Sequence, residues 1–490
     1  MSNNTKNNLL SDKEEKNNLS TIQHRLLNIK KLMEESNLHS TNPLKNIDQY
    51  TNTECYVAPK MKDSKSQDTR TVLGKRTLNF YNVINKLDGQ LVYIKSGAYG
   101  HTFKGVVTDD DETEIMSFAV KVVAYPKRDG YGTMHNITRP ENAEICMLKL
   151  LSYFVIKGQT PHIILPISIF DTSIKPFLTL QTNDPNDTIV PVDNKNYKEF
   201  IKHYHQGKYY EKVSVVISEW ANRGDLGMFL KKNYKKCQLI HWQCFFFQIL
   251  SVLAVIQSKY PTFRHNDFKA NNILISKSET CNKKFVYKVN KKEYILPAIG
   301  YCTYIWDFDF ACIPNVVENS KVYQQWTNDM NITSKQNRYY DAHYFFCTLI
   351  YKGFLPELMT DECVPKEVKD FINYVVPEKY RPTTQTCQIL VKKMLNDKNL
   401  PDNIKNEIKL FIDKITDKNF KDYTYKEFVY KIINNDETSL NLKNFFKNLP
   451  KEYIQKVNER CRLLVDDELF IPSDLLENDF FKNFFHHKIK

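Results

Sequence analysis

The sequence lacks paired cysteines, an apolar leader and long hydrophobic runs. Its 11 cysteines are scattered singly, with no C-x-x-C pair and no Cys/His cluster at zinc spacing, which predicts reduced thiols in a cytosol-like compartment. The N-terminus is polar where a signal peptide would be apolar, and the most apolar run, residues 245–256, is too short to span a bilayer. We therefore expect an intracellular, soluble protein with no signal peptide and no transmembrane segment.

Internal repeats and nucleic-acid motifs are also absent. Because no repeat of about 20 to 50 residues is present, we do not expect a solenoid or a propeller. The 69 basic and 57 acidic residues leave a net charge of +12, which favours acidic partners. No basic stripe with interleaved aromatics is present, so we expect no specific nucleic acid. A peripheral contact with acidic membrane surfaces and the oligomeric state stay open.

Length and composition indicate a folded protein with a polar extension. The 490 residues, 42% hydrophobic and 26% charged, lie in the globular range and suffice for roughly two or three domain-sized units. Residues 1–78 form the extension, which carries one helical pattern made by Ile22, Leu26, Ile29 and Met33. This helix either docks a partner or packs on its own domain, and we favour the second.

Two lobes follow the extension. Residues 79–218 contain short β-type runs and one helical segment, which predicts a small sheet carrying a helix. The runs are 91–94, 118–125, 162–170 and 213–218, and the helical segment is 140–157. Residues 219–490 are mainly helical, with β-type pieces at 273–276 and 303–306 and a less typical part from about 382. The pattern predicts an α+β, bilobal fold with a ligand cleft between a small β-rich N-lobe and a larger helical C-lobe.

The strongest chemical signal is the sequence HNDFKANNIL at residues 265–274. It places a carboxylate, an ammonium and an amide at Asp267, Lys269 and Asn272. Phosphoryl transfer requires a group that orients the attacking hydroxyl, cations that offset phosphate charge, and oxygen ligands for magnesium. The three residues would supply these in that order. A polar turn between a helix and a strand is the alternative for the three residues taken alone.

A glycine-containing hairpin and a strand lysine precede this loop. The hairpin SGAYG runs through Ser96, Gly97, Ala98, Tyr99 and Gly100, and its backbone amides can approach phosphate oxygens. A generic hairpin turn would explain both glycines equally well. The strand sequence FAVK ends in a lysine at position 121, and Lys121 can reach the α- and β-phosphates if a carboxylate holds it. An exposed strand lysine is the alternative.

Two further carboxylates complete the set. Glu141 and Glu144 lie one helical turn apart, so they share a face. We favour Glu144 as the partner of Lys121, because it begins an E-I-x-x-L pattern whose apolar residues would pack inward, whereas Glu141 can complement the helix dipole. Asp307, in the sequence WDFDF after a β-type run, is placed to ligate magnesium that bridges the β- and γ-phosphates.

Together these motifs resemble the eukaryotic-type protein kinase family over about residues 90–350. The resemblance implies ATP and Mg²⁺ as cofactors, with Asp267 and Lys269 catalytic and Asn272 and Asp307 as metal ligands. It also implies a hinge at residues 219–221 that binds adenine mainly through backbone groups. The remaining implied roles are a gatekeeper at Ser218, hinge positions at Glu219 and Ala221, a ribose contact at Asp225, and structural roles for Asp341 and Arg381.

The departures narrow the resemblance. Lys95 occupies the position of the first loop glycine, D-F-D replaces D-F-G, and a YYDxHxF run follows a short activation segment. These features resemble the serine/threonine kinases packaged in poxvirus virions and their relatives in other large DNA viruses. This resemblance implies transfer of the ATP γ-phosphate to protein hydroxyls, with virion or assembly proteins as substrates. It places the enzyme in the host cytoplasm or the virion.

Other departures bear on regulation. Asn266 replaces an arginine that pairs with a phosphorylated activation loop, so loop phosphorylation is not expected to be the main switch. Asp309 replaces a glycine and would either add a metal ligand or disfavour a flipped-out state. The A-P-E motif is missing, which puts the usual peptide-docking platform in doubt. Thr327, Thr333 and Ser334 are either autophosphorylation sites or ordinary loop residues.

Two other functions compete with a protein kinase. A choline-kinase-like phosphotransferase also carries H-N-D with a downstream asparagine, but Lys269 is typical of protein serine/threonine kinases. A catalytically inactive scaffold is possible in principle because a fold does not imply a function. The complete set of phosphotransfer residues argues against it.

Overall fold

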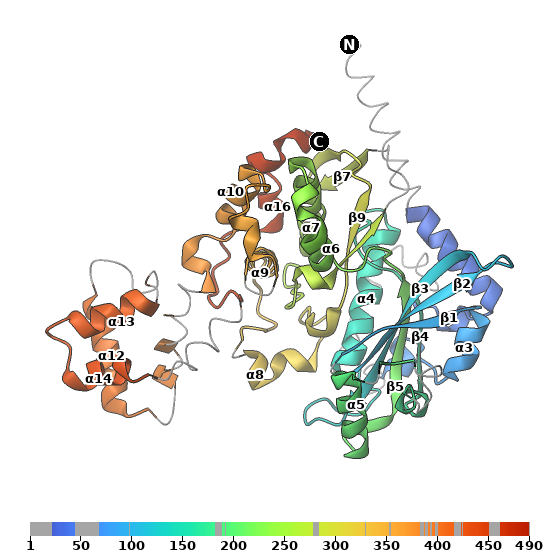
Figure 1. The fold of residues 1–490 in the computed structure, drawn as a ribbon, viewed down its shortest axis with the longest axis horizontal. Coiled ribbons are helices and arrows are strands. Elements are labelled where there is room, and N and C mark those ends of the chain that lie inside the picture. Colours follow the sequence, from blue (N-terminus) through green and yellow to red (C-terminus); the bar gives the residue numbers. More distant parts are fainter. Residues whose placement is uncertain are drawn as a thin grey trace, which may run out of the picture.

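The computed structural model consists of two lobes with an additional helical group (Figure 1). The small lobe holds the large sheet, and the larger lobe is mainly helical. Helices α12 (Asp402–Lys414), α13 (Tyr425–Asn434) and α14 (Leu440–Lys447) lie at the far end of the molecule. This arrangement confirms the predicted α+β, bilobal fold. The structure describes residues 22–44, 68–97, 99–181, 189–191, 193–277, 284–328, 330–351, 354–382, 387, 391–392, 394–396, 400–415, 423, 425–449 and 461–489.

The small lobe is built on a five-stranded antiparallel sheet in the order β1-β2-β3-β5-β4. Side chains of β2 alternate between buried and half-buried, as expected for a strand with one covered face. Helix α4 begins at a proline, which suits the first turn of a helix. The bounds are β1 Gln90–Ser96, β2 Gly100–Thr108, β3 Glu114–Pro126, β4 Pro166–Ser173, β5 Tyr209–Glu219, α2 Thr69–Val72, α3 Phe80–Lys86, α4 Pro140–Ile156 and α5 Lys195–His205.

Two parts of the polar extension pack on this lobe. A helix at residues 22–36 buries Ile22, Ile29 and Met33 in the main hydrophobic core, so it packs on its own domain as we favoured. Farther along, the ammonium of Lys75 is fully buried and lies 2.9 Å from the carboxylate of Asp171 on β4. The extension is therefore tied to the sheet by apolar contacts and by a buried ion pair.

The larger lobe surrounds one long apolar helix, α7 (Leu239–Lys259). This helix has 21 residues and is long and apolar enough to cross a membrane, so the expectation based on the shorter run 245–256 used the wrong length. However, 83% of its most apolar window is buried inside the protein. Burial, rather than length, indicates that α7 is a core helix.

Short sheets and helices pack around α7. Strands β6 and β9 form a two-stranded sheet, and β10, β8 and β7 form a three-stranded one. The bounds in this lobe are α6 Leu226–Asn233, β6 Ile273–Lys277, β7 Phe285–Val289, β8 Lys292–Leu296, β9 Tyr301–Ile305, α8 Gln325–Asn328, α9 Tyr340–Leu349, α10 Lys366–Val375, α16 Pro472–Leu475 and β10 Phe485–Lys488.

Two portions of the C-terminal region belong to different cores. Helices α12 (Asp402–Lys414), α13 (Tyr425–Asn434) and α14 (Leu440–Lys447) contribute to a second hydrophobic cluster that includes Ile408 and Phe428. Farther along, Leu463 and Phe481 return to the main core. The larger lobe is therefore closed by residues that follow the additional helical group in the chain.

Candidate active site

The loop that carries Asp267 lies between α7 and β6 and is anchored by Asp341 on α9. The two carboxylate oxygens of Asp341 accept hydrogen bonds from the backbone N–H groups of His265, at 2.7 Å, and of Asn266, at 2.9 Å. Asp341 is completely buried. A buried carboxylate with two backbone donors fixes the loop without a contact to solvent, which is the bracing role implied by the resemblance.

Asp267 is surrounded by the residues that the motif predicts. Its Oδ2 atom lies 2.7 Å from Lys269 Nζ and 2.9 Å from Asn272 Nδ2. Burial alone would raise the pKa of the Asp267 carboxyl, but the positive charges of Lys269 and Arg462 outweigh it and hold that pKa below its usual value. Asp267 is therefore an ionised carboxylate and a weak base at neutral pH.

Asn272 and Asp307 lie at the same end of the β6–β9 sheet. Ile273 pairs with Ile305 in this sheet, and Trp306 N–H donates to the Asn272 carbonyl at 3.1 Å. The amide nitrogen of Asn272 donates to Asp267, which leaves its side-chain oxygen directed elsewhere. Carboxylate and amide oxygens are the ligand types that Mg²⁺ prefers, so this pair fits the implied metal.

Lys121 connects the small lobe to Asp307 of this pair. Its ammonium lies 2.5 Å from Glu144 on α4 and 2.8 Å from Asp307. Glu141, the alternative partner, instead pairs with Arg139 at 3.2 Å. The structure thus brings together the three residues Lys121, Glu144 and Asp307 from separate parts of the sequence.

The charges of this trio are unevenly shared. Burial opposes ionisation of Asp307, but the Lys121 ammonium outweighs it and holds the pKa of Asp307 well below its ordinary value. Burial raises the pKa of Glu144 to about 7, an effect that Lys121 opposes and that the negative charge of Asp307 reinforces. The carboxylates of Glu144 and Asp307 both pair with the ammonium of Lys121. If a cation were bound to Asp307, Lys121 would pair with Glu144 alone.

The glycine-containing hairpin is a tight turn. Gly97 N–H donates to the Gly100 carbonyl at 2.8 Å, and a Cβ atom at Gly100 would lie 1.9 Å from the carbonyl oxygen of Val122. The Ser96 hydroxyl is buried against His101, at 2.9 Å, so this side chain stabilises the turn. The Tyr99 carbonyl accepts from Ala124 N–H. The predicted phosphate contact Ala98 lies outside the described residues.

The helix at residues 22–36 contacts the implied hinge at Glu219 through Arg25. The guanidinium of Arg25 donates to both carboxylate oxygens of Glu219, at 2.8 and 2.6 Å, and to the carbonyls of Pro161 and Ile163, each at 2.7 Å. Leu165 N–H donates to the same carboxylate. The Glu219 side chain is thus fully engaged, and the backbone N–H of Glu219 donates to the Leu165 carbonyl at 3.1 Å.

Two further nucleotide contacts are implied by the resemblance, Ala221 in the hinge and Asp225 as a ribose contact. Ala221 is buried, with 4% of its surface exposed. Asp225 caps α6 by accepting from Met228 N–H at 2.9 Å, and it also accepts from the Asn271 side chain at 3.1 Å. The Asp225 carboxylate therefore already accepts two hydrogen bonds, and a ribose hydroxyl would have to bind the same carboxylate. The gatekeeper position, Ser218, is buried.

The segment after Asp307 is held by neutral and basic groups without a phosphate. Asn266 adopts φ of 64°, which asparagine tolerates, and its amide donates to the carbonyls of Phe310 and Thr333 at 3.1 Å. Arg264 donates to the Thr333 hydroxyl at 2.9 Å. Thr327 is fully buried, so it is not an accessible phosphorylation site.

Asp309 forms an ion pair with Lys321, whose ammonium also lies 3.9 Å from the centre of the Phe310 ring. Burial would lower the pKa of Lys321, but the attraction of Asp309 outweighs it and raises that pKa. The sequence leaves two roles open for Asp309, an additional metal ligand or a residue that disfavours a flipped-out state. Its pairing with Lys321 favours the second role.

Two residues at the site have no counterpart among the predicted ones. Arg25 holds the hinge, and Arg462 donates to the Asp267 carboxylate at 3.1 Å. Their partners lie 194 and 195 positions away, respectively, and no local spacing signals such pairs. Arg381, by contrast, donates to the Val376 carbonyl and the Asn373 side chain, so it has the structural role that the resemblance implies.

A separate cavity of about 740 Å³ lies outside this site. Its lining includes Phe154 and Lys157 near the end of α4, Val255 on α7, and Arg338. None of its lining residues is a predicted nucleotide or metal contact. The convergent charges at Asp267 and Lys121, rather than the size of a cavity, therefore identify the candidate active site.

Comparison with known proteins gives consistent matches. A family model described as poxvirus serine/threonine protein kinase matches residues 133–408. A candidate serine/threonine-protein kinase of Acanthamoeba polyphaga mimivirus is 41% identical over 389 residues, which cover 76% of this chain and 78% of that protein. A second candidate kinase of the same virus is 32% identical over 26% of this chain and 33% of its own length. Serine/threonine-protein kinase 2 of monkeypox virus is 28% identical over 35% of this chain and 38% of its own length.

Proposed function

This chain belongs to the poxvirus serine/threonine protein kinase family, and we propose that it transfers the γ-phosphate of ATP to serine and threonine hydroxyls of proteins at the cleft between its lobes. The observation that carries this proposal is the assembled trio of Lys121, Glu144 and Asp307 beside the ionised Asp267. A protein kinase requires the lysine–glutamate pair and the metal-binding aspartate to be in place together.

Each task that phosphoryl transfer requires has a residue available for it in this chain. Gly97 and Gly100 allow the backbone to approach phosphate oxygens, and Lys121 would bind the α- and β-phosphates while Glu144 orients it. Asp307 and Asn272 would hold magnesium, which supplies charge neutralisation for the β- and γ-phosphates when bound. Lys269 would offset the charge of the transferred phosphoryl group.

Asp267 would act chiefly by orientation. Its lowered pKa makes it a weak base, so removal of the hydroxyl proton would be late in the reaction. As an ionised acceptor it can hold the attacking hydroxyl in line with the phosphoryl group. Most of the rate enhancement is then expected from positioning and electrostatics.

The direct test measures transfer of labelled γ-phosphate from Mg-ATP by the purified protein. The acceptors in the assay are basic proteins, acidic proteins and choline. We expect label on serine or threonine of a protein, and a loss of at least about a hundredfold in Asp307→Asn, because one electrostatic contact is typically worth that factor. Asp309→Asn is the comparison variant, since the same substitution two residues away removes the partner of Lys321 but keeps the aspartate that is assigned to the metal.

Other outcomes would assign another function. Label on choline alone would indicate a small-molecule kinase. No transfer together with no ATP binding would indicate an inactive scaffold. Retention of more than about a hundredth of the wild-type rate in Asp307→Asn would contradict the metal assignment.

We further propose that the substrates are virion or assembly proteins and that the enzyme acts in the host cytoplasm or the virion. The viral origin of the similar kinases supports this proposal. The basic charge of +12 is compatible with peripheral contact with acidic membranes during assembly. Fractionation of infected cells tests the location, and phosphoproteomics of purified particles tests the substrates. Absence of the protein from both the cytoplasmic fraction and the purified virions would contradict the proposal.

A further inference from the structure

A C-terminal strap (residues 461–468) runs along the chain segment at 331–338, in the part of the larger lobe where the A-P-E motif is missing. Leu463 of the strap is fully buried in the main core. Side chains from the segment and from the rest of the lobe anchor the strap along its length. The anchoring pairs are Asn331–Leu463 at 2.7 Å, Lys335–Asp466 at 2.6 Å, Arg338–Glu468 at 2.5 Å and Tyr380–Asp467 at 2.7 Å.

The strap inserts one arginine, Arg462, between α9 and the catalytic loop. Its guanidinium donates to the Asn266 carbonyl, to the Tyr340 hydroxyl at 3.0 Å and to Asp267 Oδ1 at 3.1 Å. It also lies 4.4 Å from the centre of the Tyr344 ring. Only 8% of the residue is exposed, so the contact with Asp267 is shielded from solvent.

We propose that Arg462 is a positioning residue for phosphoryl transfer, which fixes the catalytic carboxylate of Asp267 from the side of α9. This inference rests on the proposed function and deepens it. Lys269 and Asn272 hold the Oδ2 atom, and Arg462 holds Oδ1, so the carboxylate cannot rotate about its bond. The strap thereby supplies an active-site contact from a region outside the matched kinase segment.

The contact leaves room for a substrate hydroxyl. A carboxylate offers about four acceptor positions, and Lys269, Asn272 and Arg462 fill three of them at 2.7 to 3.1 Å. Tyr344 approaches the fourth position only to 3.4 Å. An incoming hydroxyl can replace this long contact without displacing Arg462.

The test compares Arg462→Gln and Arg462→Lys with the wild type, with Asp466→Asn as the matched control. Asp466 belongs to the strap, but its ion pair is exposed and does not contact Asp267. We expect kcat of Arg462→Gln to fall about ten- to a hundredfold with an unchanged KM for ATP, because an oriented charge next to the reacting group is lost. Arg462→Lys should recover part of this loss, and Asp466→Asn should behave as the wild type.

The split between kcat and KM, together with rescue by lysine, separates positioning from a merely structural role. Arg462→Lys keeps a positive charge that can reach Asp267 Oδ1, so it should recover kcat, whereas a structural defect would not respond to the type of cation. A loss of kcat that lysine does not recover, or a rise in KM for ATP that accounts for the loss of activity, would overturn the inference. Unchanged kcat would also overturn it, and raised kcat would indicate that the strap blocks the substrate instead.

Thermal unfolding provides a readout that does not depend on activity. A double-mutant cycle with Asp267→Asn and Arg462→Gln should give a clear coupling, because either single change leaves a buried group without its partner. Additive effects would overturn the contact itself. If the wild type transfers no phosphate while the coupling is present, the proposed function fails and the contact between the two residues stands.

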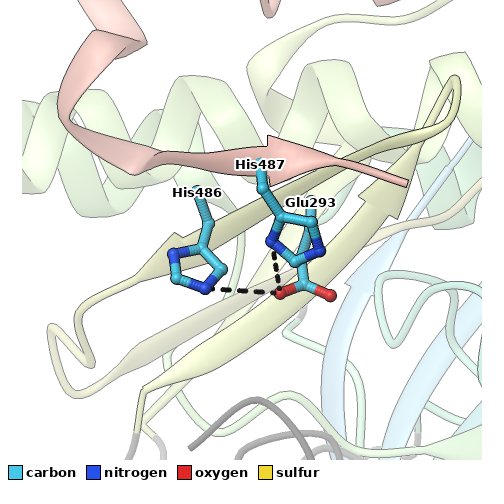
Figure 2. A group of neighbouring side chains, drawn as sticks. All are labelled: Glu293, His486 and His487. Atoms are coloured by element: carbon cyan, nitrogen blue, oxygen red, sulfur yellow. Dashed lines mark ion pairs between the residues drawn. The ribbon is translucent and has the colours of Figure 1, made fainter. Parts of the chain in front are cut away.

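A second, independent cluster lies at the edge of the three-stranded sheet (Figure 2). Glu293 on β8 faces His486 and His487 on β10, with Oε1 lying 3.9 Å from His486 Nε2 and 3.5 Å from His487 Nδ1. Glu293 is 3% exposed, and its Oε1 atom has no hydrogen-bond partner among the described residues. The pairing register shifts between Phe485 and His487, and this bulge lets the two adjacent histidines face the same carboxylate.

We propose that Glu293, His486 and His487 bind a divalent transition metal such as Zn²⁺. The three ligand atoms lie within 4.8 Å of one another. Neighbouring ligand atoms around a tetrahedral Zn²⁺ lie roughly 3.4 Å apart, so the side chains must close around the metal as it binds. Two imidazoles and one carboxylate leave a fourth position for water. Such a metal would satisfy the buried carboxylate oxygen and would join the C-terminal strand to β8.

Calorimetric titration of the full chain with Zn²⁺ tests this site, with His486→Ala and His487→Ala as variants and His205→Ala, on α5, as the matched control. We expect one site per chain, weakened at least about tenfold in each variant and unchanged in the control. A rise in melting temperature with Zn²⁺ should accompany binding in the wild type. Absence of binding, or equal binding in all four proteins, would overturn the proposal.

Discussion

Arg25 should stabilise the hinge of this kinase from outside the kinase lobes, and Arg25→Met tests this directly. The variant keeps an apolar stem but removes four hydrogen bonds, two to Glu219 and two to backbone carbonyls. The ion pair is mostly buried, since its side chains are 11% and 18% exposed. Removing one partner of a buried pair costs about 3–5 kcal/mol, and the residual exposure favours the lower end, about 3 kcal/mol.

Hydrogen–deuterium exchange of the helix at 22–36 and of the hinge measures this loss locally. A cost of about 3 kcal/mol corresponds to roughly a hundredfold faster exchange in both segments, because each 1.4 kcal/mol is about a factor of ten. The KM for ATP should rise in parallel, since the hinge loses its support. Lys30→Ala is the control on the same helix, because its pair with Glu34 is exposed and worth only about 0.3–0.5 kcal/mol. Exchange in Arg25→Met within about twofold of that control would refute the reasoning.

Three further predictions concern the two lobes. Glu144→Gln should reduce phosphate transfer about a hundredfold by releasing Lys121, while Glu141→Gln should reduce it far less; kinetics at saturating Mg-ATP compares them. Burial raises the pKa of Glu144 in the folded protein to about 7. Without Mg-ATP, ionisation of Glu144 therefore lowers the free energy of unfolding as pH rises from the ordinary carboxyl pKa to about 7, and above that pH the loss is complete. Melting curves should therefore show Glu144→Gln gaining stability over the wild type as pH rises from about 4.5 to 7, and a pH-independent difference would contradict this shift. Thr333→Val should retain wild-type kcat, and phosphatase treatment should not inactivate the enzyme, because Asn266 donates to the Thr333 carbonyl and Arg264 donates to the carbonyls of Asn331 and Lys335, and these contacts survive the substitution; loss of activity after either treatment would show that a phosphate is required.

The catalytic loop could be predicted from the sequence because its chemistry is local. Asp267, Lys269 and Asn272 lie within six consecutive residues, so their spacing alone brings them into contact once a turn forms. Glu144 could be favoured over Glu141 because it begins an E-I-x-x-L pattern whose apolar residues, Ile145 and Leu148, pack inward as expected. The identity of the family also followed from these local motifs and was confirmed by the comparisons.

The supporting contacts could not be predicted, because they join residues that are far apart in the chain. Arg25 and Arg462 each form a buried ion pair across more than 190 positions, and neither lies in a periodic pattern that marks it as special. The three-stranded sheet is also completed by the C-terminal strand β10, whose sequence FHHK carries only a weak strand signal. Tertiary packing, rather than local propensity, determines these features.

The contact between Arg462 and Asp267 has a consequence for the timing of synthesis. The ribosome must add 195 residues after the catalytic aspartate before its partner has been made. At about 5–20 residues per second, this takes roughly 10–40 s, during which the small lobe can already fold. A nascent chain that ends before the strap therefore holds the Asp267 loop without its contact to Arg462. Synthesis of the strap thus ends the period in which only local residues orient the Asp267 carboxylate.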